Sequence, residues 1–111
     1  MSFYRTAQEI RVVDGHILVA VVEQEGGNWD ESTFDLNECI GNDEGRFLWG
    51  GRDFAGSAQD ISFAIEGADS VPVLRARLAN SEGEWFDADV NLAEHITNRN
   101  GVLEYQEESL L

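Results

Sequence analysis

Carboxylates are the most abundant chemically active side chains in this sequence, which has 22 acidic residues and seven basic ones. A pair such as Glu23 and Asp35 is what glycoside hydrolysis requires, because one carboxyl group protonates the leaving oxygen and the other acts as nucleophile or base. In so acidic a chain, some pair of this kind is expected from composition alone. No catalytic triad, phosphate-binding loop or metal signature accompanies it. The sequence therefore favours a protein that is not an enzyme.

Histidine and cysteine, the usual ligands of zinc, are few and do not stand at metal-binding spacing. His16 and His95 are far apart, and the single cysteine, Cys39, can form neither an internal disulfide nor a zinc knuckle. The segment DLNECIGNDEG at 35–45 offers oxygen ligands but lacks the spacing of an EF-hand loop. We therefore expect packing or surface roles for both histidines and the cysteine, and no metal or cofactor. A calcium-binding module stays open as a less favoured alternative.

The net charge of −15 bears on partners and on compartment. Such a surface repels phosphate backbones and anionic membrane faces, which predicts no nucleic-acid partner and no membrane insertion. No apolar run approaches membrane length, and the segment MSFYRTAQEI lacks the features of a signal peptide. With one cysteine, we expect a reduced, cytoplasmic protein, with non-classical release as an open alternative.

The chain contains an internal duplication. FYRTAQEI (3–10) aligns with FAGSAQDI (54–61), ILVAVVEQEGGNW (17–29) with VLRARLANSEGEW (73–85), and FDLNECIGNDEG (34–45) with VNLAEHITNRNG (90–101). The pairs Trp29/Trp85 and Ile40/Ile96 are identical at one offset of 56 residues. Repeat one spans about 2–51 and repeat two about 52–107, within a single domain of residues 1–111.

Turn signals divide each repeat into short strands. Asp14-Gly15 predicts a hairpin because both positions tolerate a positive φ, and EGGN (25–28), NDEG (42–45) and NRNG (98–101) mark further turns. TAQE and NECI suit single helical turns. The offset between the repeats grows by five residues along SFAIEGADSVP, where we expect a longer hairpin loop in repeat two.

Alternation predicts which side chains form the core. In LRARL, the side chains of Leu74, Ala76 and Leu78 share one face and the two arginines share the other, and the corresponding inward set in repeat one is Leu18, Ala20 and Val22. Val19 and Val21 then point outward. We favour ordinary packing for them, with an exposed apolar strip as the alternative.

The segments FYRTAQEI, DLNECIGNDEGRFLWGGRDF, SAQDI and NLAEHITNRNG resemble the cyanovirin-N homology lectins, in particular the filamentous-fungal members, over roughly residues 2–106. The resemblance implies an all-β fold of two pseudo-symmetric halves. Each half has a three-stranded antiparallel sheet and a β-hairpin, with short 3-10 turns, and the repeats exchange segments. It also implies binding of mannose-rich glycans, chiefly α1,2-linked mannose pairs, without catalysis or metal.

One departure from the family concerns disulfides. The founding member has a bridge in each half, and the matching positions here are Ala7 with Val22 and Ala58 with Leu78. Both bridges are replaced by apolar pairs, which fits the reducing compartment expected from the cysteine count. Burial of each pair contributes about 1–3 kcal/mol through apolar area.

The resemblance places one sugar site in each half. The positions in the half that holds the termini are all polar and are the favoured site: Ser2, Arg5, Thr6, Glu23, Gln24, Glu25, Asn98, Arg99 and Asn100. The positions in the other half are less well equipped, because Gly41, Gly56 and Ala79 replace polar ones, and we expect that site to be weak or silent. Its polar members are Asn42, Asp43, Glu44, Arg52, Asp53, Ser57, Asn80 and Ser81.

Several of these residue types have structural explanations too. Asn42 and Asn98 stand where turn backbone groups need partners, and we expect both to satisfy them. The three tryptophans, Trp29, Trp49 and Trp85, could stack on sugar rings, but their strand positions favour core packing. The partner we expect is an oligomannose glycan bound weakly by a monomer, with a domain-swapped dimer about Gly50-Gly51 as an alternative. An interaction module that has lost sugar binding is the runner-up function.

Overall fold

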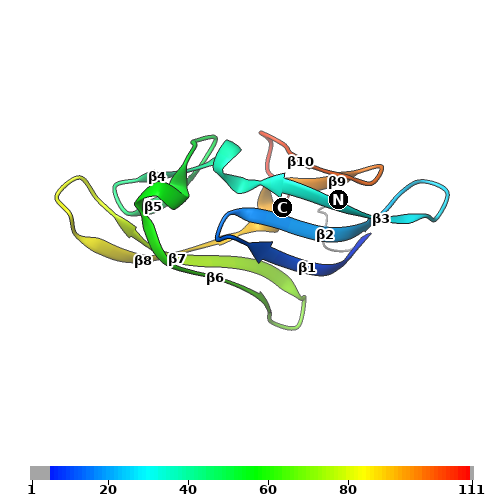
Figure 1. The fold of residues 1–111 in the computed structure, drawn as a ribbon, viewed down its shortest axis with the longest axis horizontal. Coiled ribbons are helices and arrows are strands. Elements are labelled where there is room, and N and C mark those ends of the chain that lie inside the picture. The colour runs from blue at the N-terminus through cyan, green and yellow to red at the C-terminus, as the bar shows by residue number, and fades with distance from the viewer. Residues whose placement is uncertain (1–5, 111) are drawn as a thin grey trace.

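The computed structural model describes residues 6–110 as an elongated all-β molecule with principal extents of 51 × 25 × 25 Å (Figure 1). The strands in that range are β1 (Ala7–Val13), β2 (Ile17–Glu23), β3 (Trp29–Asp35), β4 (Ile40–Asp43), β5 (Arg46–Trp49), β6 (Ala58–Glu66), β7 (Val71–Ala79), β8 (Trp85–Asn91), β9 (Ile96–Arg99) and β10 (Val102–Tyr105). Short 3-10 turns are η2 (Leu36–Glu38), η3 (Phe54–Ser57) and η4 (Leu92–Glu94). No helix in the described part of the chain is long and apolar enough to cross a membrane.

Each half of the molecule uses strands from both repeats. The strands β1–β2–β3 and β6–β7–β8 form two antiparallel sheets, and β4–β5 and β9–β10 form two hairpins. The hairpin β9–β10 of repeat two lies against β3, whereas β4–β5 of repeat one lies against β8 (Figure 1). The predicted fold of two halves with exchanged segments is therefore confirmed.

The first hairpin follows from its turn residues. Asp14 and Gly15 adopt φ of 53° and 77°, and the His16 N–H donates to the Val13 carbonyl at 3.2 Å. The longer hairpin expected in repeat two is present, but its extra length lies mainly in the strands. β6 and β7 have nine residues each where β1 and β2 have seven. The loop itself is longer by one residue, 67–70 against 14–16, because the apolar residues of this segment continue the ladder.

The core is built by the alternation seen in the sequence. Leu18, Ala20 and Val22 from β2 are buried together with Leu74 from β7, and Phe54 from η3 is fully buried in the same cluster. Further members come in repeat-equivalent pairs: Leu36 with Leu92 and Ile40 with Ile96. Because both repeats supply this one cluster, neither half has a separate core.

The outward valines are packed, as we favoured. Val19 is only 4% exposed and Val21 is half-buried. Arg11 on β1 is in register with Val19, Glu31 on β3 is in register with Val21, and these two charged side chains form an ion pair across β2 at 3.1 Å. The alternative of an exposed apolar strip is wrong at Val19.

The positions that replace disulfides in the family are cross-strand neighbours. Ala7 is in register with Val22, and Ala58 with Leu78. Val22 and Leu78 are fully buried, and both alanines pack against the core. Apolar contact therefore joins the strands at the places where the resemblance puts a covalent bond in the founding member.

Two expectations about local structure were wrong. TAQE forms no helical turn beyond Thr6, because Ala7 already pairs with β2, whereas the NECI turn is present as η2. Trp29 and Trp85 are not core residues, since each begins a strand at the edge of its sheet and is about two-fifths exposed: 40% and 39%.

Only Trp49 of the three tryptophans packs as we predicted. Its ring stacks on Tyr105 with centroids 6.0 Å apart and lies 4.7 Å from the ring of His95. His95 also hydrogen-bonds the Gln106 carbonyl through Nδ1 at 2.7 Å, and Cys39 is buried. Packing roles for His95 and Cys39 are thus confirmed.

Candidate functional site

Two repeat-equivalent asparagines join the turns of each half. The Asn98 side chain donates to Thr6 Oγ1 at 3.0 Å and to the Glu23 carbonyl at 2.8 Å, and accepts from the Gly101 N–H. Asn42 makes the corresponding bonds to Ser57 Oγ, the Ala79 carbonyl and the Gly45 N–H. The expectation that these asparagines satisfy turn backbone groups is confirmed, and each also connects a hairpin to a sheet from the other repeat.

The turn between β2 and β3 and the turn between β9 and β10 meet at one end of the molecule (Figure 1). A hollow of about 500 Å³ lies between them. The predicted residues that line it are Thr6, Glu23, Gln24, Glu25, Asn98 and Asn100. We call it the terminal-half hollow. Six positions that lie up to 94 residues apart in the chain, from Thr6 to Asn100, are thus brought together.

The lining of this hollow is rich in hydrogen-bond acceptors. The Glu25 N–H donates to Asn100 Oδ1 at 2.8 Å, and the Asn100 amide N–H groups have no acceptor among residues 6–110. Gln24 donates to the Asp30 carboxylate and thereby fixes its own side chain. The carboxylates of Glu23 and Glu25 have no hydrogen-bond or ion-pair partner within residues 6–110. Both carboxylates can therefore accept hydrogen bonds from the hydroxyl groups of a ligand.

Three members of the predicted terminal-half set remain. Ser2 and Arg5 lie outside the described residues. Arg99 is 73% exposed, and its Nε lies 3.7 Å from Glu104 Oε1 on the neighbouring strand. Conversely, Gly26, Gly27 and Thr97 line the hollow although we did not predict them as site residues. The two glycines belong to the predicted turn EGGN, which was the available signal, whereas nothing in the sequence distinguishes the buried Thr97.

The turn between β4 and β5 and the turn between β7 and β8 lie at the opposite end of the molecule (Figure 1). The repeat-equivalent hollow there has a volume of about 340 Å³. We call it the second hollow. The predicted residues that line it are Asn42, Asp43, Glu44, Ser57, Asn80 and Ser81, together with Ala79. Arg52 and Asp53 do not line it. The Asp53 N–H donates to the Asn37 carbonyl at 2.8 Å, and Asp53 has a φ of 61° at the start of η3.

Polar groups in the second hollow are largely bonded to one another. Both carboxylate oxygens of Glu44 accept from Ser81, one from the N–H and one from the hydroxyl, each at 2.8 Å. The bond from the Ser81 backbone N–H, and to a smaller extent the bond from its hydroxyl, lower the pKa of Glu44 from its ordinary value. Asn80 Oδ1 accepts from the Glu82 and Glu84 N–H groups within its own turn. The second hollow therefore offers fewer unused acceptors than the terminal-half hollow.

The carboxylate pair considered for catalysis is not brought together. Glu23 is in register with Trp29 at one end of the β2–β3 ladder and Asp35 with Ile17 at the other, which puts them about 20 Å apart along the sheet. Asp35 accepts from His16 Nδ1 at 2.8 Å and from the Asn37 N–H. Although burial alone would raise it, the pKa of Asp35 is lowered by these bonds. Asp35 thus caps η2, and within residues 6–110 no group of three or more His, Cys, Asp or Glu is arranged to hold a metal ion.

Both hollows suit a ligand that presents several hydroxyl groups. A hydroxyl donates and accepts at once, so it can bond a carboxylate and an amide N–H in the same site. The lining residues stand on turns fixed by Asn42 and Asn98, which limits the ordering cost of binding.

The sequence and the fold both have clear relatives. The model of the CVNH domain matches residues 3–104. A cyanovirin-N homolog of Neurospora crassa is 44% identical over 105 residues, which cover 91% of this chain and 95% of the relative. The NMR structure of a Gibberella zeae CVNH protein superposes with a TM-score of 0.88 at 47% identity, covering 93% of this chain and 95% of that one.

Two further similar structures contain sugar. The complex of microvirin with mannobiose has a TM-score of 0.83 at 25% identity, covering 95% of this chain and 99% of that one. A variant of MoCVNH3 in complex with (N-GlcNAc)4 has a TM-score of 0.80 at 26% identity, covering 93% and 95%. With the domain model matched over nearly the whole chain and curated homologs this similar, the chain belongs to the CVNH family of lectins.

Proposed function

We propose that this protein is a carbohydrate-binding lectin for mannose-rich glycans, chiefly α1,2-linked mannose pairs. The observation that carries the proposal is the terminal-half hollow, where turns from both repeats hold unused acceptors and amide donors around one opening. Membership of the CVNH family and the mannobiose complex of microvirin support the same ligand class. Neither catalysis nor a metal ion is needed for this function.

The chemistry of recognition follows from the lining. Hydroxyls of the disaccharide donate to the carboxylates of Glu23 and Glu25, and the Asn100 amide N–H donates to a sugar oxygen. An epimer with one misplaced hydroxyl would leave a desolvated acceptor without its bond, which is how such a site discriminates between sugars. Because few apolar groups take part, we expect a Kd of about 10 µM to 1 mM, or roughly −7 to −4 kcal/mol.

We assign the main site to the terminal half and expect the second hollow to be weak or silent. Two observations support this choice. The terminal-half hollow is the larger, at about 500 Å³ against 340 Å³. In the second hollow, Glu44 already accepts two bonds from Ser81, so a sugar hydroxyl must compete with groups of the protein itself.

An NMR shift-perturbation titration with α1,2-mannobiose tests the proposal. We expect saturable shifts at the amides of residues 23–27 and 97–101, unchanged by EDTA. Unmoved resonances at saturating mannobiose would refute mannose binding. A parallel titration with (GlcNAc)4 would identify a lectin of different specificity if only that sugar shifted these amides.

A matched pair of variants tests the choice of half. Glu25→Ala removes a carboxylate that has no partner among the described residues, so binding should weaken about tenfold while the fold is kept. Ser81→Ala changes the repeat-equivalent residue of the second hollow and should leave the main affinity unaltered. Loss of binding in the Ser81 variant alone would move the main site to the second hollow.

A further inference from the structure

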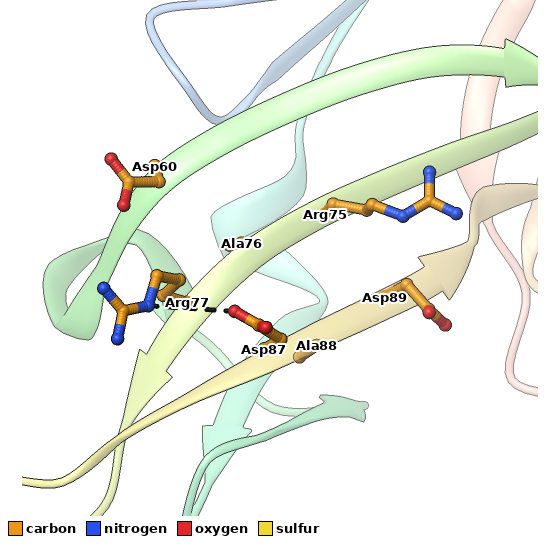
Figure 2. Close-up of a pocket in the computed structure, with 7 residues that line it drawn as sticks. All are labelled: Asp60, Arg75, Ala76, Arg77, Asp87, Ala88 and Asp89. Atoms are coloured by element: carbon orange, nitrogen blue, oxygen red, sulfur yellow. Dashed lines mark ion pairs between the residues drawn. The ribbon is translucent and has the colours of Figure 1, made fainter.

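A third hollow, of about 390 Å³, lies on the outer face of the β6–β7–β8 sheet. It shares no lining residue with the two turn hollows. Figure 2 shows its charged lining, which comes from all three strands: Asp60 on β6, Arg75 and Arg77 on β7, and Asp87 and Asp89 on β8. Ala76 and Ala88 are cross-strand partners between the two arginines, and Ala76 is buried. Because alternation turns both alanine side chains toward the core face, the backbone of β7 and β8 forms the middle of the hollow.

The fold does not require this charged face. The repeat-equivalent positions of Arg75 and Arg77 are Val19 and Val21, which pack under the Arg11–Glu31 ion pair on the other sheet. The same strand geometry thus accepts either valine or arginine. Two of the seven basic residues of the chain therefore lie on this face, and the equivalent positions of the other sheet have no basic residue.

The charges on this face are only partly paired. Both Arg75 terminal nitrogens bond the Glu66 carboxylate, and in Figure 2 the Arg75 side chain points along β7 away from Arg77. Arg77 Nε lies 3.7 Å from Asp87 Oδ1, which is longer than a hydrogen bond. Asp60 and Asp89 have no hydrogen-bond or ion-pair partner in the part of the chain that the structure describes. One guanidinium and three carboxylates are left with free bonding capacity.

This combination selects the class of ligand. An anion would be repelled by Asp60, Asp87 and Asp89, and a cation, although these carboxylates attract it, would leave the Arg77 guanidinium without a new partner. A neutral hydroxylated ligand satisfies both kinds of group, because each hydroxyl donates to a carboxylate and accepts from Arg77. Trp85 adds an apolar surface. It is 39% exposed, two residues before Asp87 on β8 and opposite Ala79, so alternation places it on the same outer face.

We propose that the outer face of β6–β7–β8 is an additional binding surface for a neutral saccharide, with Arg77, Asp87 and Asp89 bonding its hydroxyls and Trp85 contacting its C–H face. This surface is independent of the terminal-half hollow. It would give the protein a second point of contact with a branched glycan, which raises avidity without a tighter individual site.

The test is an NMR titration in which the two regions report separately. With α1,2-mannobiose or (GlcNAc)4 raised to tens of millimolar, we expect saturable shifts at the amides of residues 75–78 and 85–89 and at the Trp85 indole N–H. Arg77→Val copies Val21 of the other repeat, and Asp89→Thr copies Thr33, so both variants should fold. Each should weaken the outer-face response about tenfold, because a hydrogen bond to a charged group is lost, and leave residues 23–27 unaffected.

The matched control is Arg46→Val, which removes one positive charge from β5 and copies the repeat-equivalent Val102. It should leave the outer-face response unchanged. The proposal is overturned if neither sugar shifts these amides, or if the shifts persist in both outer-face variants. It is equally overturned if sodium sulfate or free arginine shifts the region and the sugars do not.

Discussion

At the scale of single residues, Asn42 and Asn98 have a structural role, because they connect the two repeats. Each amide group makes three hydrogen bonds that join a hairpin of one repeat to a sheet of the other. Because these bonds are partly buried, water replaces them poorly when the side chain is removed. Asn98, which we proposed as a sugar-binding residue, therefore also holds in place the turns that line the hollow.

Asn98→Ala should therefore destabilise the protein as well as weaken sugar binding. Loss of its bonds to Thr6, Glu23 and Gly101 should lower the free energy of unfolding by about 2–3 kcal/mol. Asn42→Ala should cost a similar amount, because its bonds are equivalent. Urea denaturation followed by tryptophan fluorescence measures both. Asp43→Ala, at the exposed end of β4, is the control, and an Asn98 variant as stable as that control would contradict a structural role for the amide.

Cys39 illustrates how burial changes the chemistry of a side chain. Burial, followed by the nearby carboxylates of Glu38 and Asp35, raises the pKa of its thiol to about 12. The reactive thiolate is thus nearly absent at pH 8 in the folded protein. We expect labelling with Ellman's reagent to be very slow under native conditions and rapid in urea. Fast stoichiometric labelling of the native protein would mean that the region around η2 opens readily.

At the scale of elements, the sequence identified most strands through their turns and their alternation. Asp14-Gly15 and the Leu74, Ala76, Leu78 series determined the hairpin and the buried face because both signals are local. The sequence predictions failed where contacts between distant segments determine the local structure. TAQE has no local signal that separates a turn from a strand, and Trp29 has a strand pattern that does not reveal how close it lies to the sheet edge.

The junction between the repeats depends on a close approach of two backbones. A Cβ atom added to Gly51 would lie 2.8 Å from Gly41 Cα and 2.9 Å from Gly41 N, which are backbone atoms that cannot move independently. Gly51→Ala should therefore force β4 away from the junction and lower the unfolding free energy by about 2 kcal/mol. Size-exclusion chromatography should also show whether the strained junction opens to a swapped dimer, in place of the monomer that we expect for the parent chain.

Gly56→Ala is the matched control for the junction, because nothing lies within 4 Å of its added Cβ. It should be neutral in the same urea titration. Equal stability of the two variants would mean that the chain after Gly50 has room to rearrange around a methyl group.

At the scale of the whole molecule, the candidate site could be predicted only through the duplication and the family resemblance. Thr6 and Asn100 are 94 residues apart, and no local pattern indicates that their turns meet. Repeat equivalence then explains why a second hollow lies at the other end. Arg52, Asp53 and Arg99 were included by position in the family motif, yet none of them lines its hollow, a difference that depends on packing around each turn.

The exchange of segments also makes a prediction about folding. The hairpin β9–β10 lies on β3, β4–β5 lies on β8, and the buried cluster draws on both repeats. Each half is therefore incomplete without the other repeat, and about 50 residues alone bury too little apolar surface to be stable. We expect the full chain to unfold in one cooperative transition by both tryptophan fluorescence and circular dichroism.

Fragments 1–51 and 52–111, expressed separately, should give the poorly dispersed amide spectra of unfolded chains. When mixed, they should regain the native spectrum, because each supplies the hairpin that the other lacks. A dispersed spectrum from either fragment alone would show that a single repeat holds a sufficient core, and that the exchange of segments adds binding sites but little stability.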